Sequence, residues 1–412
     1  MIRTPQAAGR AQRLPFLAFL AGSLVSLSGN AITTIAIPWF VLVTTGSPAK
    51  MGLVAFFQVV PNVLASVFGG ALVDRLSYKW ISIVSDLLSA VTVAAIPLFH
   101  TTVGLPFWLL LVFVFCGAAL DAPGNTARLA MVPNLAKVSG VSVERANAAL
   151  QSVSGLGGLV GPILAGVIVA WVGASEALWL DALTFLWSAS LMALAVPDLG
   201  ARAASTGRFV HDVLEGLGVL VRSRLLFALL VLAATLNFVS VPLFTVVLPV
   251  LARDAYGGPS NLGFLIAAVG AGSFTGSLVF AAIGPRLPRG RLLSLLVGAA
   301  ALALIPLSFL PPFLVVFLTL MTFGFAIGTS GPLFLTIYQE HVPEEFRGRV
   351  FGSIGACLSM IAPLGLLAAG WSIGVVGVRP VLVTAATIHV VATLALLFAP
   401  AFRELDRPPA GN

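Results

Sequence analysis

The chain of 412 residues contains twelve apolar runs, each long enough to form one membrane-crossing helix. A helix that rises ~1.5 Å per residue needs about 20 residues to cross ~30 Å of hydrocarbon. The runs cover residues 14–44, 51–73, 80–99, 106–131, 146–171, 175–196, 225–251, 262–284, 292–310, 312–338, 350–374 and 380–399. They predict an all-α membrane protein with twelve transmembrane helices.

The composition excludes most soluble classes of protein. Apolar residues make up 59% of the chain and charged residues only 9%, whereas a soluble protein carries about 25% charged residues. A soluble enzyme could not hide that much apolar surface. The two cysteines, Cys116 and Cys357, lie far apart in apolar runs, so we expect neither a disulfide framework, nor a metal site, nor a cofactor.

The basic residues of the loops are distributed very unevenly. With twelve spans, 19 basic residues, Arg128 among them, fall on the side of the two termini, and three fall on the other side. Cytoplasmic loops are enriched in Lys and Arg, so both termini are predicted to be cytoplasmic. The net charge of +7 then reflects membrane topology, and no nucleic-acid partner is expected.

The longest polar interruption divides the chain into two halves. Within it, Phe209–Arg222 carries apolar residues at helical spacing, with Asp212 and Glu215 on the opposite face. This pattern is typical of an amphipathic helix on the cytoplasmic membrane surface. We therefore predict an N-terminal six-helix bundle, a linker and a C-terminal six-helix bundle, at residues 1–197, 198–224 and 225–412.

Features of the first half recur in the second half. The recurring pairs are Gly52 with Gly263, Arg75 with Arg286, Asn30 with Asn237, and Val132-Pro133 after span 4 with Val342-Pro343 after span 10. The glycine pair and the arginine pair are both 211 residues apart. A parallel repeat of this kind indicates two bundles related by an axis along the membrane normal.

The connection between spans 2 and 3 reads Gly70-Ala-Leu-Val-Asp74-Arg75-Leu-Ser77-Tyr-Lys79. It resembles motif A of the major facilitator superfamily, with Ser77 in place of the second glycine. An acidic residue beside two cations at a helix end predicts a cytoplasmic gate formed by Gly70, Asp74, Arg75 and Lys79. The alternative is an ordinary positively charged loop.

Span 5 contains Gly157, Gly161, Pro162 and Gly166, and this pattern resembles motif C of the exporters in the same superfamily. Small residues and a proline permit close helix approach and a kink, so plain packing is the alternative interpretation. Segments that include Thr126-Ala-Arg128, Arg347-Gly348-Arg349-Val350 and Arg403-Glu404-Leu405-Asp406 are similar to the Tap-type branch of drug-efflux facilitators.

The resemblance implies a proton-driven exporter in the plasma membrane of a bacterium, with a small molecule, protons and membrane lipid as partners. We expect a monomer and no enzymatic activity. The chain has no G-x-x-x-x-G-K-[ST] motif that would indicate use of ATP. The glycines of 270–276 lie inside span 8, so they are interpreted as helix packing and not as a dinucleotide-binding loop.

Ionisable residues inside a span usually mark a transport pathway. Asp121 and Asp181 are predicted to couple transport to protons. The resemblance places span 4, which carries Asp121, at the central cavity, and span 6, which carries Asp181, in the outer scaffold. The alternatives are an Asp121–Arg128 structural pair and a scaffold hydrogen bond of Asp181. Asp86 is expected to pair with Arg75, Lys79 or Arg128, and His389 is expected to be either a packing residue or a proton relay.

Neutral polar residues complete the predicted substrate cavity, which comprises Asn30, Asn62, Asn125, Arg128, Gln151 and Asn237. Hydrogen bonding between helices explains the amides equally well. The leading hypothesis is proton-coupled antiport of amphiphilic drugs by alternating access. An exporter or flippase of an endogenous lipid or siderophore-like metabolite is the runner-up, and a sensor that transports nothing is the third hypothesis.

Overall fold

The structure is a computed structural model that describes residues 10–73, 77–198, 209–399, 401–402 and 405. Within these ranges all regular elements are helices. They are α1 (Arg10–Thr45), α2 (Pro48–Val73), α3 (Tyr78–Thr102), α4 (Phe107–Val138), α5 (Val143–Val172), α6 (Ala174–Ala195), α7 (Phe209–Arg222), α8 (Arg224–Pro242), η1 (Leu243–Val247), α9 (Leu248–Asp254), α10 (Pro259–Ile283), η2 (Gly284–Arg286), α11 (Arg289–Leu307), α12 (Phe313–His341), η3 (Glu344–Phe346), α13 (Arg347–Val376) and α14 (Val378–Phe398).

Eleven stretches of the described residues are long and apolar enough to cross a membrane. They coincide with eleven of the twelve expected spans, so the chain is a multi-pass membrane protein. The second expected span corresponds to α2, whose 26 residues are not among the eleven stretches. The total of twelve therefore stays a prediction.

One span departs from a continuous α-helix. The stretch Arg224–Asp254 consists of α8, the five-residue π-helix η1 and α9. Pro242 ends α8, and proline has no N–H to donate. The carbonyl of Phe238, four residues earlier, therefore lacks its helical donor. Gly365 of α13 packs against this carbonyl so closely that a Cβ at Gly365 would lie 2.4 Å from the oxygen.

Two pairs of helices are joined by a single glycine. Gly173 connects α5 to α6 and Gly377 connects α13 to α14, with φ angles of 97° and 82°. Only glycine adopts such angles without a steric penalty. These matching turns occupy equivalent places in the two halves of the chain.

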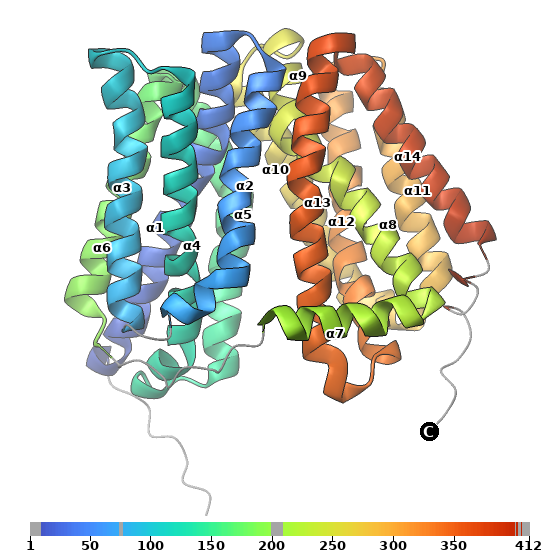
Figure 1. The fold of residues 1–412 in the computed structure, drawn as a ribbon, viewed down its shortest axis with the longest axis horizontal. Helices are drawn as coiled ribbons and strands as arrows, with labels where there is room; N and C mark the ends of the chain where they lie inside the picture. The colour runs from blue at the N-terminus through green and yellow to red at the C-terminus, as the bar shows by residue number, and fades with distance from the viewer. Residues whose placement is uncertain (1–9, 74–76, 199–208, 400, 403–404, 406–412) are drawn as a thin grey trace, which may run out of the picture. The chain divides into compact units, whose positions relative to one another are not determined.

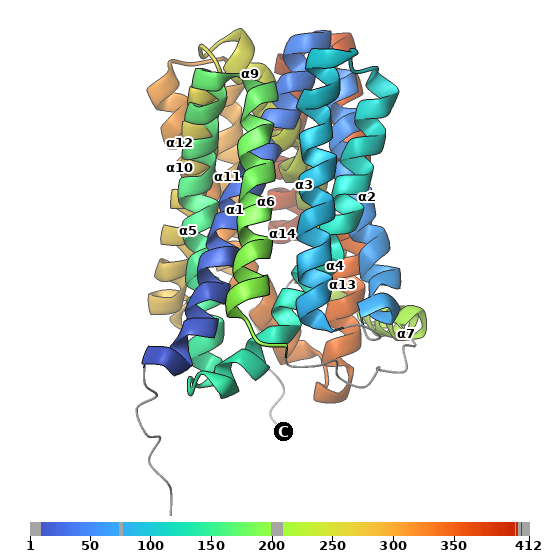
Figure 2. The same cartoon turned by 90° about the vertical axis from the view of Figure 1, so that its left-hand side faces the viewer.

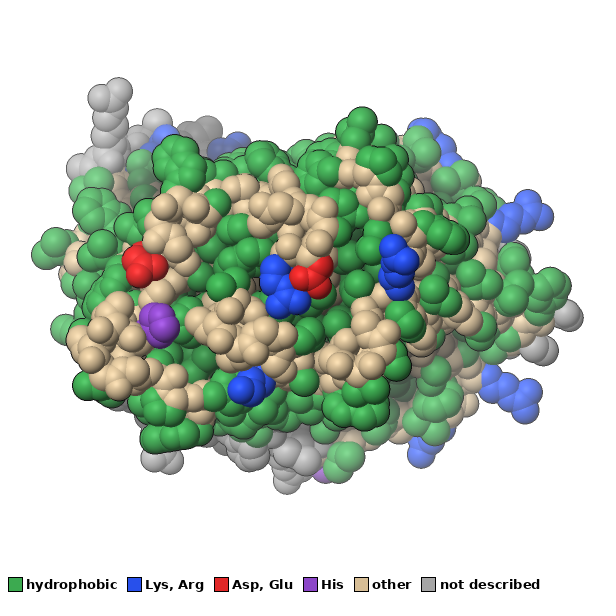
Figure 3. Space-filling view, turned by 90° about the horizontal axis from the view of Figure 1, so that it is seen from above, with side chains coloured by type: hydrophobic (Ala, Val, Ile, Leu, Met, Phe, Trp, Pro, Cys, Tyr) green, Lys and Arg blue, Asp and Glu red, His purple; other side chains and the backbone are tan. Residues whose placement is uncertain are grey.

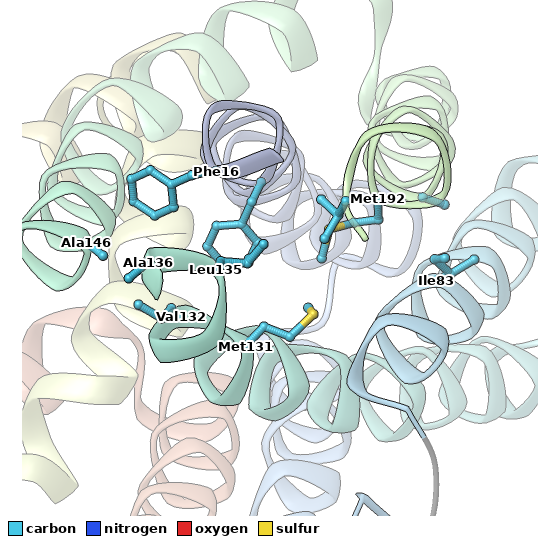
Figure 4. Close-up of a cluster of buried hydrophobic side chains, with 11 residues drawn as sticks. Phe16, Ile83, Met131, Val132, Leu135, Ala136, Ala146 and Met192 are labelled. Carbon is cyan, nitrogen blue, oxygen red and sulfur yellow. The ribbon is translucent and has the colours of Figure 1, made fainter. Parts of the chain in front are cut away.

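The chain forms two compact units. Unit 1 comprises Met1–Phe40 and Phe57–Gly207, and unit 2 comprises Val41–Phe56 and Arg208–Asn412. In unit 1, α3 packs against both α4 and α6 (Figure 2). Residues of α1, α3, α4, α5 and α6 share a buried apolar cluster that includes Phe16, Met131, Leu135 and Met192 (Figure 4).

In unit 2, α10 packs against α12, and α11 packs against α12 and α14. The helix α7, which has the predicted bounds of the amphipathic segment, lies across the ends of the spanning helices of this unit (Figure 1). It contacts α13 and α8, so the linker helix groups with unit 2. Figure 3 shows a face on which charged side chains are scattered among hydrophobic ones.

Candidate functional site

A buried ion pair lies inside unit 1. The guanidinium of Arg128 on α4 contacts the carboxylate of Asp86 on α3, and both side chains are less than a tenth exposed. The same guanidinium donates hydrogen bonds to three serine hydroxyls, each at 3.1 Å, on α3, α1 and α6. These are Ser82, Ser26 and Ser188. One side chain therefore ties four helices together.

The position of Arg128 corrects the interpretation of α4. Arg128 was counted with the cytoplasmic loops, but α4 continues through Pro133 to Val138, and Arg128 is buried inside it. Val132-Pro133 likewise lies within α4, whereas Val342-Pro343 follows α12. The expectation that Asp86 pairs with a nearby cation is confirmed, with Arg128 as the partner.

Asp181 on α6 is completely buried. Its carboxylate accepts hydrogen bonds from the hydroxyls of Thr33 on α1 and of Thr184 on α6, the latter at 3.1 Å. Gly29 of α1 makes room for it, because a Cβ there would lie 2.3 Å from a carboxylate oxygen. Among the described residues no cation forms an ion pair with Asp181.

Asp121 on α4 has a different environment. Its side chain is partly exposed, and its carboxylate accepts a hydrogen bond from the amide of Asn125 at 2.9 Å. The hydrogen bonds of Arg128 go to Asp86 and the serines and not to Asp121. The structure therefore brings Asp121 and Asn125 together, as their spacing predicted.

The residues of motif A are described only in part. Gly70 lies near the end of α2, while Asp74 and Arg75 lie outside the described residues. Lys79 at the start of α3 donates through Nζ to the backbone oxygen of Ala193 on α6, at 2.9 Å. This contact joins two helices of unit 1 near the end of α6.

Two glycines of motif C, Gly157 and Gly161, face α1. A Cβ at Gly161 of α5 would lie 2.9 Å from the Cβ of Ala31, and one at Gly157 would lie 3.4 Å from that of Leu27. Pro162 and Gly166 are also buried in α5. The small residues of this motif therefore let α5 approach α1 closely, whatever further role they have.

The remaining predicted cavity residues are dispersed. Asn30 is partly buried on α1, and Gln151 is exposed on α5. The side chain of Asn62 lies outside the description. Asn237 of α8 lines a cavity of about 330 Å³ inside unit 2, and this cavity is the feature that the sequence did not predict.

This cavity lies among α8, η1, α11, α12 and α14. Its polar lining residues are Asn237, Ser240, Ser330 and His389, and Phe244 and Phe334 add aromatic surface. A second, largely apolar cavity of about 200 Å³ lies among α8, η1, α13 and α14. Pro242 and Pro249 were the sequence signal for these two cavities. They interrupt the helical hydrogen bonding of the span that borders both cavities.

No group of three or more His, Cys, Asp or Glu side chains in the described ranges is arranged to hold a metal ion. The candidate site consists of buried carboxylates in unit 1 and a polar-lined cavity in unit 2.

Many membrane-crossing helices in two compact units, with ionisable groups buried inside them, define a multi-pass membrane transport protein. The chain belongs to the Major Facilitator Superfamily, whose family model matches residues 19–366. It is accordingly a transporter for small molecules and not an enzyme.

The chain is similar over nearly its whole length to drug-efflux members of this superfamily. It is 30% identical over 401 residues to the multidrug efflux pump Tap of Mycolicibacterium fortuitum, a match that covers 96% of this chain and 98% of the pump. It is 25% identical over 366 residues to macrolide efflux protein A of Streptococcus pyogenes, with coverages of 86% and 88%.

Solved structures share the fold at low identity. A variant of the nucleoside transporter NupG superposes with a TM-score of 0.79 at 13% identity, covering 93% of this chain and 98% of that one. The D-xylose-proton symporter superposes with a TM-score of 0.70 at 13% identity, covering 96% and 98%. These similarities establish the architecture of the chain.

Proposed function

We propose that this chain is an efflux transporter that exports amphiphilic small molecules in exchange for protons by alternating access. The observation that carries the proposal is the similarity to a multidrug efflux pump over 96% of the chain. The predicted motif C points in the same direction, since the resemblance links it to exporters. One proton that crosses ~100 mV releases about 2.3 kcal/mol, which supports a gradient of roughly 50-fold.

Asp121 and Asp181, for which no ion pair is found among the described residues, support proton coupling. Asp181 is fully buried, and its carboxylate accepts hydrogen bonds from two hydroxyl groups of the described residues. A buried charge is costly unless it is paired. A proton is the partner that neutralises it. Asp121 is partly exposed and has an amide neighbour, which suits a group that exchanges protons with water. By contrast, Arg128 already neutralises Asp86.

We infer that twelve spans place both termini in the cytoplasm of a bacterial cell whose plasma membrane holds the protein as a monomer. The bundles would cover 1–197 and 225–412, joined by a linker at 198–224. The distribution of 19 basic residues against three supports this topology even after Arg128 is moved into α4. The motif A residues Gly70, Asp74, Arg75 and Lys79 would form the cytoplasmic gate.

The test is transport by purified protein in liposomes with an imposed pH gradient. We expect the wild type to move ethidium against its gradient, and Asp121→Asn and Asp181→Asn to abolish the dependence on the pH gradient while the protein remains folded. Asp254→Asn is the matched control, since Asp254 is half-exposed at the end of α9 and pairs with Arg253.

Unchanged gradient-driven transport in Asp121→Asn would remove Asp121 from the coupling, and the same result in Asp181→Asn would remove Asp181. Movement of a lysophospholipid without any drug would support the runner-up function, export of an endogenous lipid. If the wild type moves no substrate at all, efflux itself is refuted.

A further inference from the structure

We propose that the cavity of about 330 Å³ in unit 2 is a subsite for an aromatic group carrying an N–H or O–H donor, and that His389 accepts its hydrogen bond. The inference rests on the proposed efflux function and adds to it a specificity-determining residue. It assigns substrate recognition to a helix, α14, on which the sequence suggested only a packing residue or a proton relay.

The size of the cavity suits part of a drug molecule. A cavity of ~150 Å³ lined by apolar side chains holds one benzene molecule, so about 330 Å³ holds a group of about two rings. Phe244 on η1 and Phe334 on α12 contribute aromatic lining, and aromatic pairs prefer offset or edge-to-face contacts. A flat aromatic group is therefore the guest that the walls favour.

The hydrogen bond of His389 leaves one nitrogen available. Its Nδ1 lies 3.0 Å from the carbonyl oxygen of Ala385, one helical turn earlier. A carbonyl can only accept, so Nδ1 carries the proton, and Nε2 of the neutral ring is an acceptor. The side chain is 2% exposed, and within the described ranges no donor reaches Nε2. His389 lines the cavity, so a guest with an N–H or O–H group there would supply the hydrogen bond that Nε2 lacks.

The other polar groups of the cavity are also neutral. Ser330 donates to the carbonyl of Ala326 at 2.7 Å, so its oxygen keeps a lone pair that faces a guest as an acceptor. Asn237 and Ser240 line the same space, and no Asp, Glu, Lys or Arg side chain is among the lining residues. The lining therefore recognises a guest through hydrogen bonds and not through charge.

Two probes of equal charge distinguish recognition by hydrogen bonds from recognition by charge. Ethidium and tetraphenylphosphonium are both permanent aromatic monocations, but only ethidium carries aromatic amino groups that donate hydrogen bonds. Affinities would be measured by calorimetry on the full chain in detergent, and transport of both probes would be measured in liposomes. The variants are His389→Phe, which removes the acceptor, and His389→Gln, which retains one.

We expect His389→Phe to weaken ethidium binding about tenfold and to leave tetraphenylphosphonium binding and transport unchanged. His389→Gln should recover most of the ethidium affinity. Unaltered binding of the second probe shows that the variant is folded.

Equal losses for both probes would show that His389 is only a packing residue, and unchanged ethidium binding in His389→Phe would show that the cavity is no subsite. Failure of the wild type to bind ethidium in detergent would likewise overturn the subsite. If the wild type binds ethidium but transports neither probe, the efflux function fails while the subsite stands.

Discussion

The two units share one architecture but are held together by different interactions. Unit 1 buries Asp86, Arg128 and Asp181 inside its helices. In unit 2 no Asp, Glu, Lys or Arg side chain among the described residues is buried, and its helices meet through glycines. A repeated fold therefore does not require a repeated set of stabilising contacts.

The closest helix contact of unit 2 lies between α10 and α12. Gly272 and Gly276 of α10 face the backbone of α12, and Gly324 and Gly328 of α12 face the backbone of α10. A Cβ at any of these positions would lie between 2.0 and 2.3 Å from a carbonyl oxygen of the other helix. Small residues that bring helix backbones together are the usual means of association in lipid, and they leave no charge near the cavity.

This difference suggests a division of labour. Unit 1 holds the groups proposed to carry protons, and unit 2 holds the neutral cavity proposed to take part of the substrate. A carboxylate in that cavity would favour cations over neutral donors, so the absence of buried acids from the described part of unit 2 agrees with recognition by hydrogen bonds.

The largest effect on stability is expected from breaking the ion pair of unit 1. Asp86→Ala leaves the buried guanidinium of Arg128 without its carboxylate, and removing one member of a buried pair costs about 3–5 kcal/mol. The measurement is the unfolding free energy of the purified protein in detergent, followed by circular dichroism.

The matched control is Glu340→Ala in unit 2, which removes the partner of Arg289 at 2.6 Å from a partly exposed pair. Such pairs contribute roughly 0–1 kcal/mol. Replacing both members of the buried pair, Asp86→Leu with Arg128→Met, should recover much of the loss, because no unpaired charge then remains. Equal losses for Asp86→Ala and Glu340→Ala would refute the contrast between the units.

A smaller loss is expected at the glycine contact of unit 2. A Cβ at Gly324 would lie 2.1 Å from the carbonyl oxygen of Val269, so Gly324→Ala must push α10 and α12 apart. Overpacking of this kind costs about 1–3 kcal/mol, measured by the same unfolding experiment.

Gly352→Ala on α13 is the control, because a Cβ there meets nothing within 4 Å. Alanine at this position should leave stability unchanged or raise it by up to ~1 kcal/mol, since alanine favours helix more than glycine does. If Gly324→Ala were as stable as the wild type, close backbone packing would not hold α10 to α12.

Hydropathy and periodicity predicted the helices well, because immersion in lipid demands long apolar runs whatever the neighbours are. The amphipathic helix over 209–222, the packing of the glycines at 270–276 and the pairing of Asp86 with a cation were all readable from residue spacing. Each depends on local sequence or on a small choice of partners.

Hydropathy and residue spacing did not predict features that depend on which helices face one another. The sequence groups Arg128 with the cytoplasmic cations, although it lies near the end of the predicted span 106–131. In the structure α4 continues through Pro133 to Val138, and Arg128 is buried inside it. The three serines whose hydroxyls accept hydrogen bonds from its guanidinium lie on other helices. The spacing of residues within a single span does not identify such partners. The cavity beside His389 is likewise formed by five elements, and hydropathy carries no information about the space left between them.

The smallest expected effect concerns the helix α7, which tests whether unit 2 uses exposed charge as well as close packing. Glu215 of α7 pairs with Arg349 of α13 at 2.8 Å, and both side chains are over a third exposed. The hydroxyl of Ser353 donates to the backbone oxygen of Val213 at 2.7 Å, and Gly216 lies against the backbone of Arg349.

Glu215→Ala should therefore cost only ~0.2–1 kcal/mol, and the cost should shrink as salt is added, because exposed pairs are screened. Gly216→Ala should cost more and be insensitive to salt, since a Cβ there would lie 2.3 Å from the carbonyl oxygen of Arg349. Hydrogen exchange of the α7 backbone measures both effects. Faster exchange in Glu215→Ala than in Gly216→Ala would mean that charge, and not close backbone contact, docks α7 on unit 2.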